Sequence, residues 1–246
     1  MVARTLIIIP AYNEKESIGG VIDRILAETP YRDIVVVNDG STDATRRVAT
    51  ERGVIVLDLP CNLGIGAAVQ TGYRFADRSG FDYVVRLDAD GQHDVSQIAD
   101  LLAPLVSGEA DFVIGSRALG DGCHRTSFAR AVGIRILASI VSRLVGRPIT
   151  DTTSGFQAAS HAVVELLARS YPDDYPEVES IVLLSRRGFR VREVGVRMAV
   201  RSAGRSSISA VGSIYYMIKV ILAIMIEMLR KESSNPVSPG TGGGVK

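Results

Sequence analysis

The sequence of 246 residues predicts an α/β fold with a mainly parallel sheet and helices on both of its faces. Short apolar runs alternate with amphipathic helical patterns along the first half of the chain, and the runs are rich in β-branched residues without a Gly or Pro to break them. Strands of that composition are typically buried on both faces, and a strand–helix–strand order favours parallel pairing. With 46% hydrophobic residues, the chain can bury a sizeable core.

Five apolar runs are predicted to be strands: Leu6–Ile9, Ile34–Val37, Val54–Leu57, Tyr83–Leu87 and Phe112–Ile114. Between the first two, apolar residues recur at helical spacing from Ile18 to Leu26. Asn13, with Glu16 three residues later, is predicted to cap this helix. Further helices are expected over 43–52 (ended by Gly53), 67–77, 96–105, 128–145 and 181–187, and a strand over 189–200.

A polar loop follows each of the first four predicted strands. The loops are Pro10-Ala11-Tyr12-Asn13-Glu14, Asn38-Asp39-Gly40-Ser41-Thr42-Asp43, Asn62-Leu63-Gly64-Ile65-Gly66 and Asp88-Ala89-Asp90-Gly91-Gln92. Each loop alone could be an ordinary turn. Because ligands bind at the carboxyl ends of the strands in such sheets, four loops in register with the strands predict a binding site on one rim.

The fourth loop is a candidate metal site. Asp88 and Asp90 are two residues apart at the end of a strand, and a turn over 89–91 would bring Gln92 close to them. Two carboxylates and an amide oxygen suit Mg²⁺ or Mn²⁺ better than Zn²⁺, and such a metal commonly holds the phosphates of a substrate. The alternative is a surface Asp-x-Asp turn.

In this order the four loops, the last continued by His93, resemble the motifs of family 2 glycosyltransferases. They are most similar to the dolichol-phosphate mannose synthase-like branch, which makes polyprenyl-phosphate sugars, and the resemblance extends from Ile7 to about Ser209. It implies a GT-A fold and inverting transfer of one sugar from a nucleotide-diphosphate donor to a polyprenyl phosphate, undecaprenyl phosphate in a bacterium.

The resemblance also implies roles for the residues of the four loops. Donor binding falls to Pro10, Tyr12, Glu14, Asp39, Gly66 and Asp88, and metal binding to Asp88, Asp90 and Gln92. The metal, Mg²⁺ or Mn²⁺, would bridge the donor's pyrophosphate and stabilise the charge that develops on the leaving group, which makes Asp90 a catalytic candidate. The motifs do not distinguish a UDP-linked from a GDP-linked sugar.

The second half of the chain is expected to bind the acceptor. The resemblance places Arg117 and Arg130 near the acceptor phosphate, which a bidentate Arg reads well. The segment 151–156 resembles an Asp-x-x-Ser-Gly-Phe element that is usually followed by Arg, where this chain has Gln157. The segment 201–207 resembles an Arg-x-x-Gly-x-Ser-Lys loop that closes over phosphates, which adds Arg201 and Ser206 to the acceptor site. In that loop Ser207 replaces the usual Lys, and Arg205 is available to replace its charge.

Glu179 matches the acidic residue that faces the acceptor in the family, and Glu177 is the second candidate. Either could instead be a first-turn acid that complements a helix dipole. For an acceptor hydroxyl, Glu179 would be the general base. A lipid phosphate is already largely ionised, because its second pKa is about 6, so Glu179 would then orient the acceptor or help to hold the metal.

The segment Val211–Leu229 bears on membrane association. As a helix it would extend about 28 Å, close to the ~30 Å thickness of a bilayer core, but Lys219 and Glu227 argue against spanning. We expect an amphipathic helix over 210–231 on the membrane surface, following a catalytic domain over 1–209 and preceding a disordered tail over 232–246. A helix packed on the core, or docked on a small membrane-protein partner, is the alternative.

Composition narrows the location and the partners. A formal net charge of +1 gives no nucleic-acid signature, and Cys61 and Cys123 lack metal-ligand spacing. The N-terminus has no signal-peptide apolar region, so we expect a cytoplasmic protein, peripheral on the cytoplasmic face of the plasma membrane. Two other functions stay open: transfer to a saccharide hydroxyl in cell-surface polysaccharide assembly, and a non-catalytic regulator that binds a nucleotide sugar.

Overall fold

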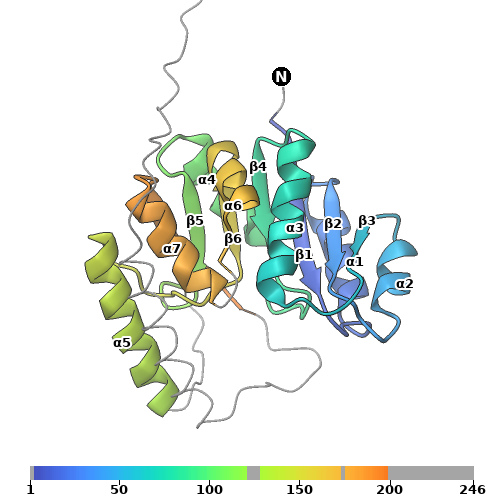
Figure 1. Ribbon diagram of the computed structural model, residues 1–246, viewed down its shortest axis with the longest axis horizontal. Coiled ribbons are helices and arrows are strands. Elements are labelled where there is room, and N and C mark those ends of the chain that lie inside the picture. Colours follow the sequence, from blue (N-terminus) through green and yellow to red (C-terminus); the bar gives the residue numbers. More distant parts are fainter. Residues whose placement is uncertain (1–2, 121–127, 173–174, 199–246) are drawn as a thin grey trace, which may run out of the picture.

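The computed structural model describes residues 3–120, 128–172 and 175–198. These residues form a seven-stranded sheet in the order β3-β2-β1-β4-β6-β5-β7 (Figure 1). The strands are β1 (Thr5–Ala11), β2 (Ile34–Asn38), β3 (Ile55–Asp58), β4 (Tyr83–Arg86), β5 (Phe112–Ser116), β6 (Gln157–Ser160) and β7 (Val191–Gly195). Every pairing in the sheet is parallel except those of β6, which runs antiparallel to β4 and β5.

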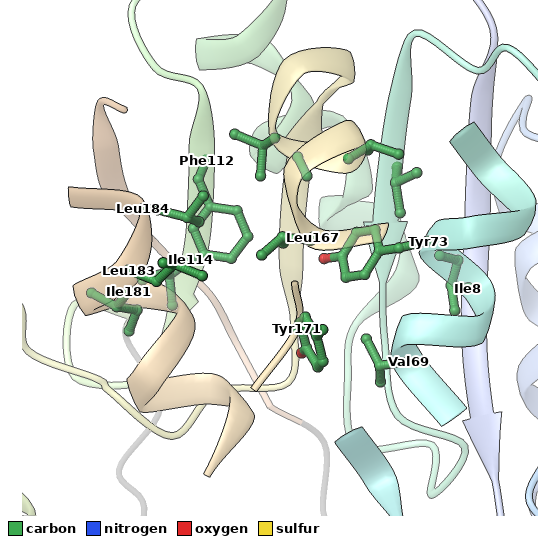
Figure 2. Close-up of a cluster of buried hydrophobic side chains, with 14 of the residues drawn as sticks. Ile8, Val69, Tyr73, Phe112, Ile114, Leu167, Tyr171, Ile181, Leu183 and Leu184 are labelled. Carbon is green, nitrogen blue, oxygen red and sulfur yellow. The ribbon is translucent and has the colours of Figure 1, made fainter. Parts of the chain in front are cut away.

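The helices are α1 (Ile18–Glu28), α2 (Thr45–Thr50), α3 (Ile65–Arg78), α4 (Ile98–Val106, preceded by the 3-10 turn Val95–Gln97), α5 (Phe128–Val145), α6 (His161–Arg169) and α7 (Pro176–Arg186). They cover both faces of the sheet (Figure 1). Because successive side chains of a strand point to opposite faces, β1 contributes to two separate apolar clusters. Leu6 and Ile8 belong to one cluster together with residues of α3, α6 and α7 (Figure 2), and Ile7 and Ile9 belong to the other together with residues of α1 and α4.

Close contact between α3 and β1 supports one side of the rim where the polar loops gather. A Cβ atom at Gly72 of α3 would lie 2.6 Å from Ile8 Cγ2, so only glycine allows the helix to lie so near the strand. The first turn of α3 is thereby held over the carboxyl end of β1.

The predicted fold class is confirmed. All five predicted strands and the helix over 128–145 are present, and the helices over 18–28, 45–50, 65–78 and 98–106 and the strand over 191–195 match their predictions within a few residues. Helix α7 begins at Pro176 rather than Ile181, since a proline in the first turn loses no hydrogen bond. Burial on both faces holds for β1, β2 and β5 but not for β3, an edge strand whose residues are only partly buried or exposed.

The predicted cap of α1 is wrong. Ser17 is the N-cap residue, and Asn13 lies outside the helix in the left-handed region at φ 56°. Its side chain instead accepts a hydrogen bond from the Thr42 N–H at 2.9 Å, so Asn13 joins the first polar loop to the second.

Several predictions concern residues that the structure does not describe. The helix over 210–231, the tail over 232–246, Arg201 and Ser206 lie outside the described residues, as does the side chain of Arg130. Among the helices of the described residues, none combines the length and the apolar character needed to cross a membrane.

Candidate active site

The four polar loops meet in one cleft with a volume of about 370 Å³. Because β1, β2 and β4 are parallel neighbours, their carboxyl ends lie at the same edge of the sheet. The cleft is lined by Pro10, Ala11, Tyr12 and Glu14 after β1, Asp39 after β2, Asn62, Gly64, Ile65 and Ala68 after β3, and Asp88, Ala89 and Asp90 after β4. The predicted convergence of these loops is therefore confirmed.

Asp39 joins the second loop to the third. The residue is only 4% exposed, and its carboxylate accepts hydrogen bonds from the N–H groups of Leu63 at 2.8 Å and Gly64 at 2.9 Å. The turn between the loops is tight as well, since a Cβ at Gly40 would lie 2.4 Å from the carbonyl carbon of Cys61. Asp39 thus shapes the cleft, in addition to its predicted role in donor binding.

Five of the six predicted donor-binding residues line the cleft: Pro10, Tyr12, Glu14, Asp39 and Asp88. Tyr12 lines the cleft and is 45% exposed. Gly66 is buried in the first turn of α3 and is not a lining residue.

The candidate metal ligands lie on a turn that starts two residues after β4. Gly91 takes a positive φ of 75°, which closes the turn, and Asp90 Oδ1 accepts from the Gln92 N–H at 3.0 Å. Both carboxylates line the cleft, whereas Gln92 is not a lining residue. Asp88 and Asp90 are therefore brought together, and Gln92, the third predicted ligand, contacts Asp90 through its backbone N–H.

Asp88 is held from two sides. Its Oδ2 lies 3.2 Å from His93 Nε2, and a Cβ at Gly155 would lie 2.5 Å from both of its carboxylate oxygens. Burial raises the pKa of Asp88, but the hydrogen bond with His93 and the charges of Arg86 and Arg117 outweigh burial and hold the pKa well below its usual range. Asp88 is accordingly an ionised carboxylate in the cleft, with 39% of its side chain exposed.

This donor set fits a hard divalent cation. Within residues 3–120, 128–172 and 175–198, no three or more His, Cys, Asp or Glu side chains come together as a metal-binding group. Mg²⁺ and similar ions, however, are often bound by one or two carboxylates together with substrate phosphates and water. Asp88 and Asp90 would hold such an ion beside a bound donor, and the chemistry it would supply is charge stabilisation.

Arg86 lies beside the candidate metal ligand Asp88, and the sequence patterns did not single it out as a site residue. Its side chain is only 2% exposed, and its Nη2 donates to Glu177 Oε1 at 2.6 Å and lies 3.7 Å from Asp88 Oδ1. Its Nη1 donates to the Tyr171 hydroxyl at 3.2 Å. A basic residue inside an otherwise apolar strand is the signal that could have identified it, because buried charges occur where they are paired.

Gln157 stands directly across from Arg86 in the antiparallel pairing of β4 and β6. Residues opposite each other in such a pair have side chains on the same face of the sheet. The site therefore has a guanidinium beside position 157, although it comes from the neighbouring strand. Gln157 itself donates to the Ser154 carbonyl oxygen at 2.9 Å.

The two glutamates of α7 make different contacts. Glu179 Oε1 accepts from the Tyr175 N–H at 3.1 Å, in the first turn of its own helix. Glu177, the second candidate, is the carboxylate that contacts Arg86. Glu177 is therefore linked through the Arg86 guanidinium to Asp88, one of the two candidate metal ligands.

Arg117 pairs with Asp151 through both ends of its guanidinium. Its Nε and Nη2 lie 2.6 Å and 2.7 Å from the two carboxylate oxygens, and Nη2 also donates to Thr153 at 2.7 Å. Glu193 of β7 accepts from the N–H groups of Thr150 and Asp151 and so fixes the loop that carries Asp151. The Arg117 side chain is 27% exposed, and its positive charge helps to lower the pKa of Asp88.

Comparisons with known proteins agree with this geometry. The chain is 35% identical over 216 residues to the polyprenol monophosphomannose synthase of Mycolicibacterium smegmatis, covering 84% of this chain and 81% of that protein. It is 32% identical over 215 residues to the undecaprenyl-phosphate mannosyltransferase of Micrococcus luteus, covering 84% and 88%.

The fold also has solved relatives. Glucosyl-3-phosphoglycerate synthase of Mycobacterium tuberculosis, in complex with Mn²⁺, UDP and phosphoglyceric acid, matches with a TM-score of 0.71 at 22% identity, covering 94% of this chain and 81% of that chain. At this identity the match shows a shared fold. The model of the family described as Glycosyl transferase family 2 matches residues 6–166, so the chain belongs to this family and is a glycosyltransferase.

Proposed function

We propose that the protein transfers a single sugar, with inversion, from a nucleotide-diphosphate sugar to a polyprenyl phosphate. The observation that carries this proposal is the cleft at the carboxyl edge of the sheet, where two carboxylates lie beside the predicted donor-binding residues. The acceptor class is supported by the names of the two mannosyl-transferring relatives, which act on polyprenol and undecaprenyl phosphate.

In this reaction a phosphate oxygen of the acceptor forms a bond to the anomeric carbon of the sugar. The bond from that carbon to the donor's phosphate oxygen breaks, and the nucleoside diphosphate leaves with the electron pair. A bound Mg²⁺ or Mn²⁺ would stabilise the charge that develops on the leaving group. Asp88 and Asp90 would hold that ion, and they would repel the two donor phosphates without it.

The chain's own residues supply orientation more than proton transfer. An acceptor phosphate is already ionised at neutral pH, so no general base is required. Arg117, kept in place by Asp151, and the predicted ligands Arg130, Arg201 and Ser206 would bind the acceptor phosphate. A lipid acceptor further requires the protein to reach a membrane, which we assign to the segment 210–231 on the cytoplasmic face.

The proposed reaction is tested by transfer of radiolabel from a panel of UDP- and GDP-sugars into organic-extractable lipid. The purified full chain is given undecaprenyl phosphate and Mn²⁺, and the Asp90→Ala variant serves as the blank. We expect label in the lipid from one donor and none in the blank. Metal-dependent donor hydrolysis without lipid product would favour a saccharide acceptor, and neither activity would favour the regulator.

Membrane association is tested separately by flotation with lipid vesicles. We expect the full chain to float with vesicles that contain anionic phosphatidylglycerol and to stay behind with neutral vesicles, because Arg201, Arg205, Arg230 and Lys231 flank the apolar segment. Absence from the floated fraction in both cases would contradict a surface helix and favour a partner-docked or core-packed one.

A further inference from the structure

Arg86 is shared between two carboxylates that belong to different parts of the site. Its Nη2 lies 2.6 Å from Glu177 Oε1 and 3.7 Å from Asp88 Oδ1, so it is hydrogen-bonded to the first and just beyond hydrogen-bond distance of the second. Asp88 comes from the turn after β4 and Glu177 from the first turn of α7, which are far apart in the sequence.

The two carboxylates compete for the one buried cation but differ in their exposure to water. The side chain of Glu177 is 17% exposed, whereas that of Asp88 is 39% exposed and faces the cleft. Charge–charge attraction is stronger where water is excluded, which favours the observed bond to Glu177. A guanidinium bonded to Asp88 would occupy an oxygen and neutralise the charge that a metal needs.

Few other contacts fix the position of the guanidinium. Tyr171 accepts one hydrogen bond from Nη1, and Arg86 Nε has no hydrogen-bond partner among the residues that the structure describes. Gln157, directly opposite on β6, carries no charge, and its Oε1 is unpartnered within the described part of the chain. The charge of Glu177 is therefore the main interaction that keeps the guanidinium about 1 Å short of bonding to Asp88.

We propose that Glu177 is a positioning residue for the donor site, which acts by holding the Arg86 guanidinium away from Asp88 and so leaves the Asp88 carboxylate available to the metal–nucleotide. This inference rests on the proposed function for the identity of the donor. Helix α7, which carries the acids expected to face the acceptor, would then influence metal binding through Arg86 Nη2.

The experiment is calorimetric titration of the full chain with Mn²⁺ and UDP, and in parallel with Mn²⁺ and GDP. In Glu177→Gln the shape is kept but the charge is lost, so the guanidinium moves toward Asp88, and we expect affinity for Mn²⁺–nucleotide to fall about five- to tenfold. In the double variant Glu177→Gln/Arg86→Gln no cation remains to compete, and affinity should return to within about twofold of the wild type.

A matched control is available on the surface. Glu165 and Arg169 of α6 form an ion pair with the same 2.6 Å separation, but both side chains are well exposed. Glu165→Gln should leave Mn²⁺–nucleotide affinity unchanged. Thermal unfolding of every variant serves as the control for folding. The double variant is expected to fold because it removes both charges of a buried pair together.

The outcomes are distinct. Wild-type affinity in Glu177→Gln, or a double variant that binds as weakly as Glu177→Gln, would overturn the inference while leaving the proposed function intact. A kcat loss in Glu177→Gln without any change in affinity would also overturn it, since that pattern indicates a group that acts in the chemical step. A wild type that binds Mn²⁺ with neither nucleotide would overturn the proposed donor and the inference built on it.

Discussion

Replacing Gly155 with alanine tests whether the position of the Asp88 carboxylate limits the reaction. A Cβ at residue 155 would lie 2.5 Å from both carboxylate oxygens of Asp88, whereas ordinary contact begins at 3.4 Å. The carboxylate would have to move by about 0.9 Å. A misplacement of about 1 Å at a reacting centre costs roughly 10²-fold in rate. We therefore expect kcat/KM of Gly155→Ala to fall by about two orders of magnitude.

The assay compares Mn²⁺-dependent sugar transfer and Mn²⁺–nucleotide affinity of Gly155→Ala with those of Gly20→Ala. Gly20 lies on α1, and a Cβ there would meet no atom of the described residues within 4 Å. Alanine in place of this helical glycine should add about 0.5–1 kcal/mol of stability and leave the kinetics unchanged. A folded Gly155→Ala variant with wild-type kcat/KM would refute the reasoning, because the carboxylate would then have room that the structure does not show.

Three further predictions concern stability and the donor site. Asp39→Asn turns an N–H of the amide toward a backbone N–H, so the free energy of unfolding should fall by about 1–3 kcal/mol and KM for the donor should rise; an unchanged urea midpoint would contradict this. Gly72→Ala places a methyl group 2.6 Å from Ile8 Cγ2, and the resulting overpacking should cost about 1–3 kcal/mol in urea unfolding, whereas wild-type stability would show that α3 can shift freely. Burial raises the pKa of Asp151, but the hydrogen bonds and charge of Arg117 outweigh burial and lower the pKa overall. The pair should therefore stabilise the fold at pH values above the unfolded-state pKa of about 3.9, and this stabilisation should be lost as the pH falls further. Unfolding measured from pH 5 downward should then be less pH-dependent in Asp151→Asn than in the wild type, and equal slopes would contradict the assignment.

Local sequence patterns predicted much of the fold because the core strands are apolar and β-branched, as for Ile34–Asn38. They missed β6, whose sequence Gln-Ala-Ala-Ser has no β-branched residue. This strand exists because it fills the space between β4 and β5 and pairs with both, which is a tertiary effect. Helix α6 was missed with it, since no strand was expected to lead into it.

The meeting of the polar loops in one cleft could be predicted because the loops follow parallel strands in order, as Asp39 follows β2 and Asp88 follows β4. The link from Arg86 to Glu177 could not be predicted. It depends on where α7 packs after the antiparallel β6, and no local pattern encodes a contact between residues 91 apart.

The most direct test of a phosphate acceptor compares undecaprenyl phosphate with undecaprenol under the same conditions. With the preferred donor and Mn²⁺, the purified protein should form a sugar–lipid product, identified by mass spectrometry, only from undecaprenyl phosphate. That result would follow from attack by an ionised phosphate oxygen without a general base. Equal transfer to undecaprenol, or transfer to a saccharide alone, would contradict the proposed function.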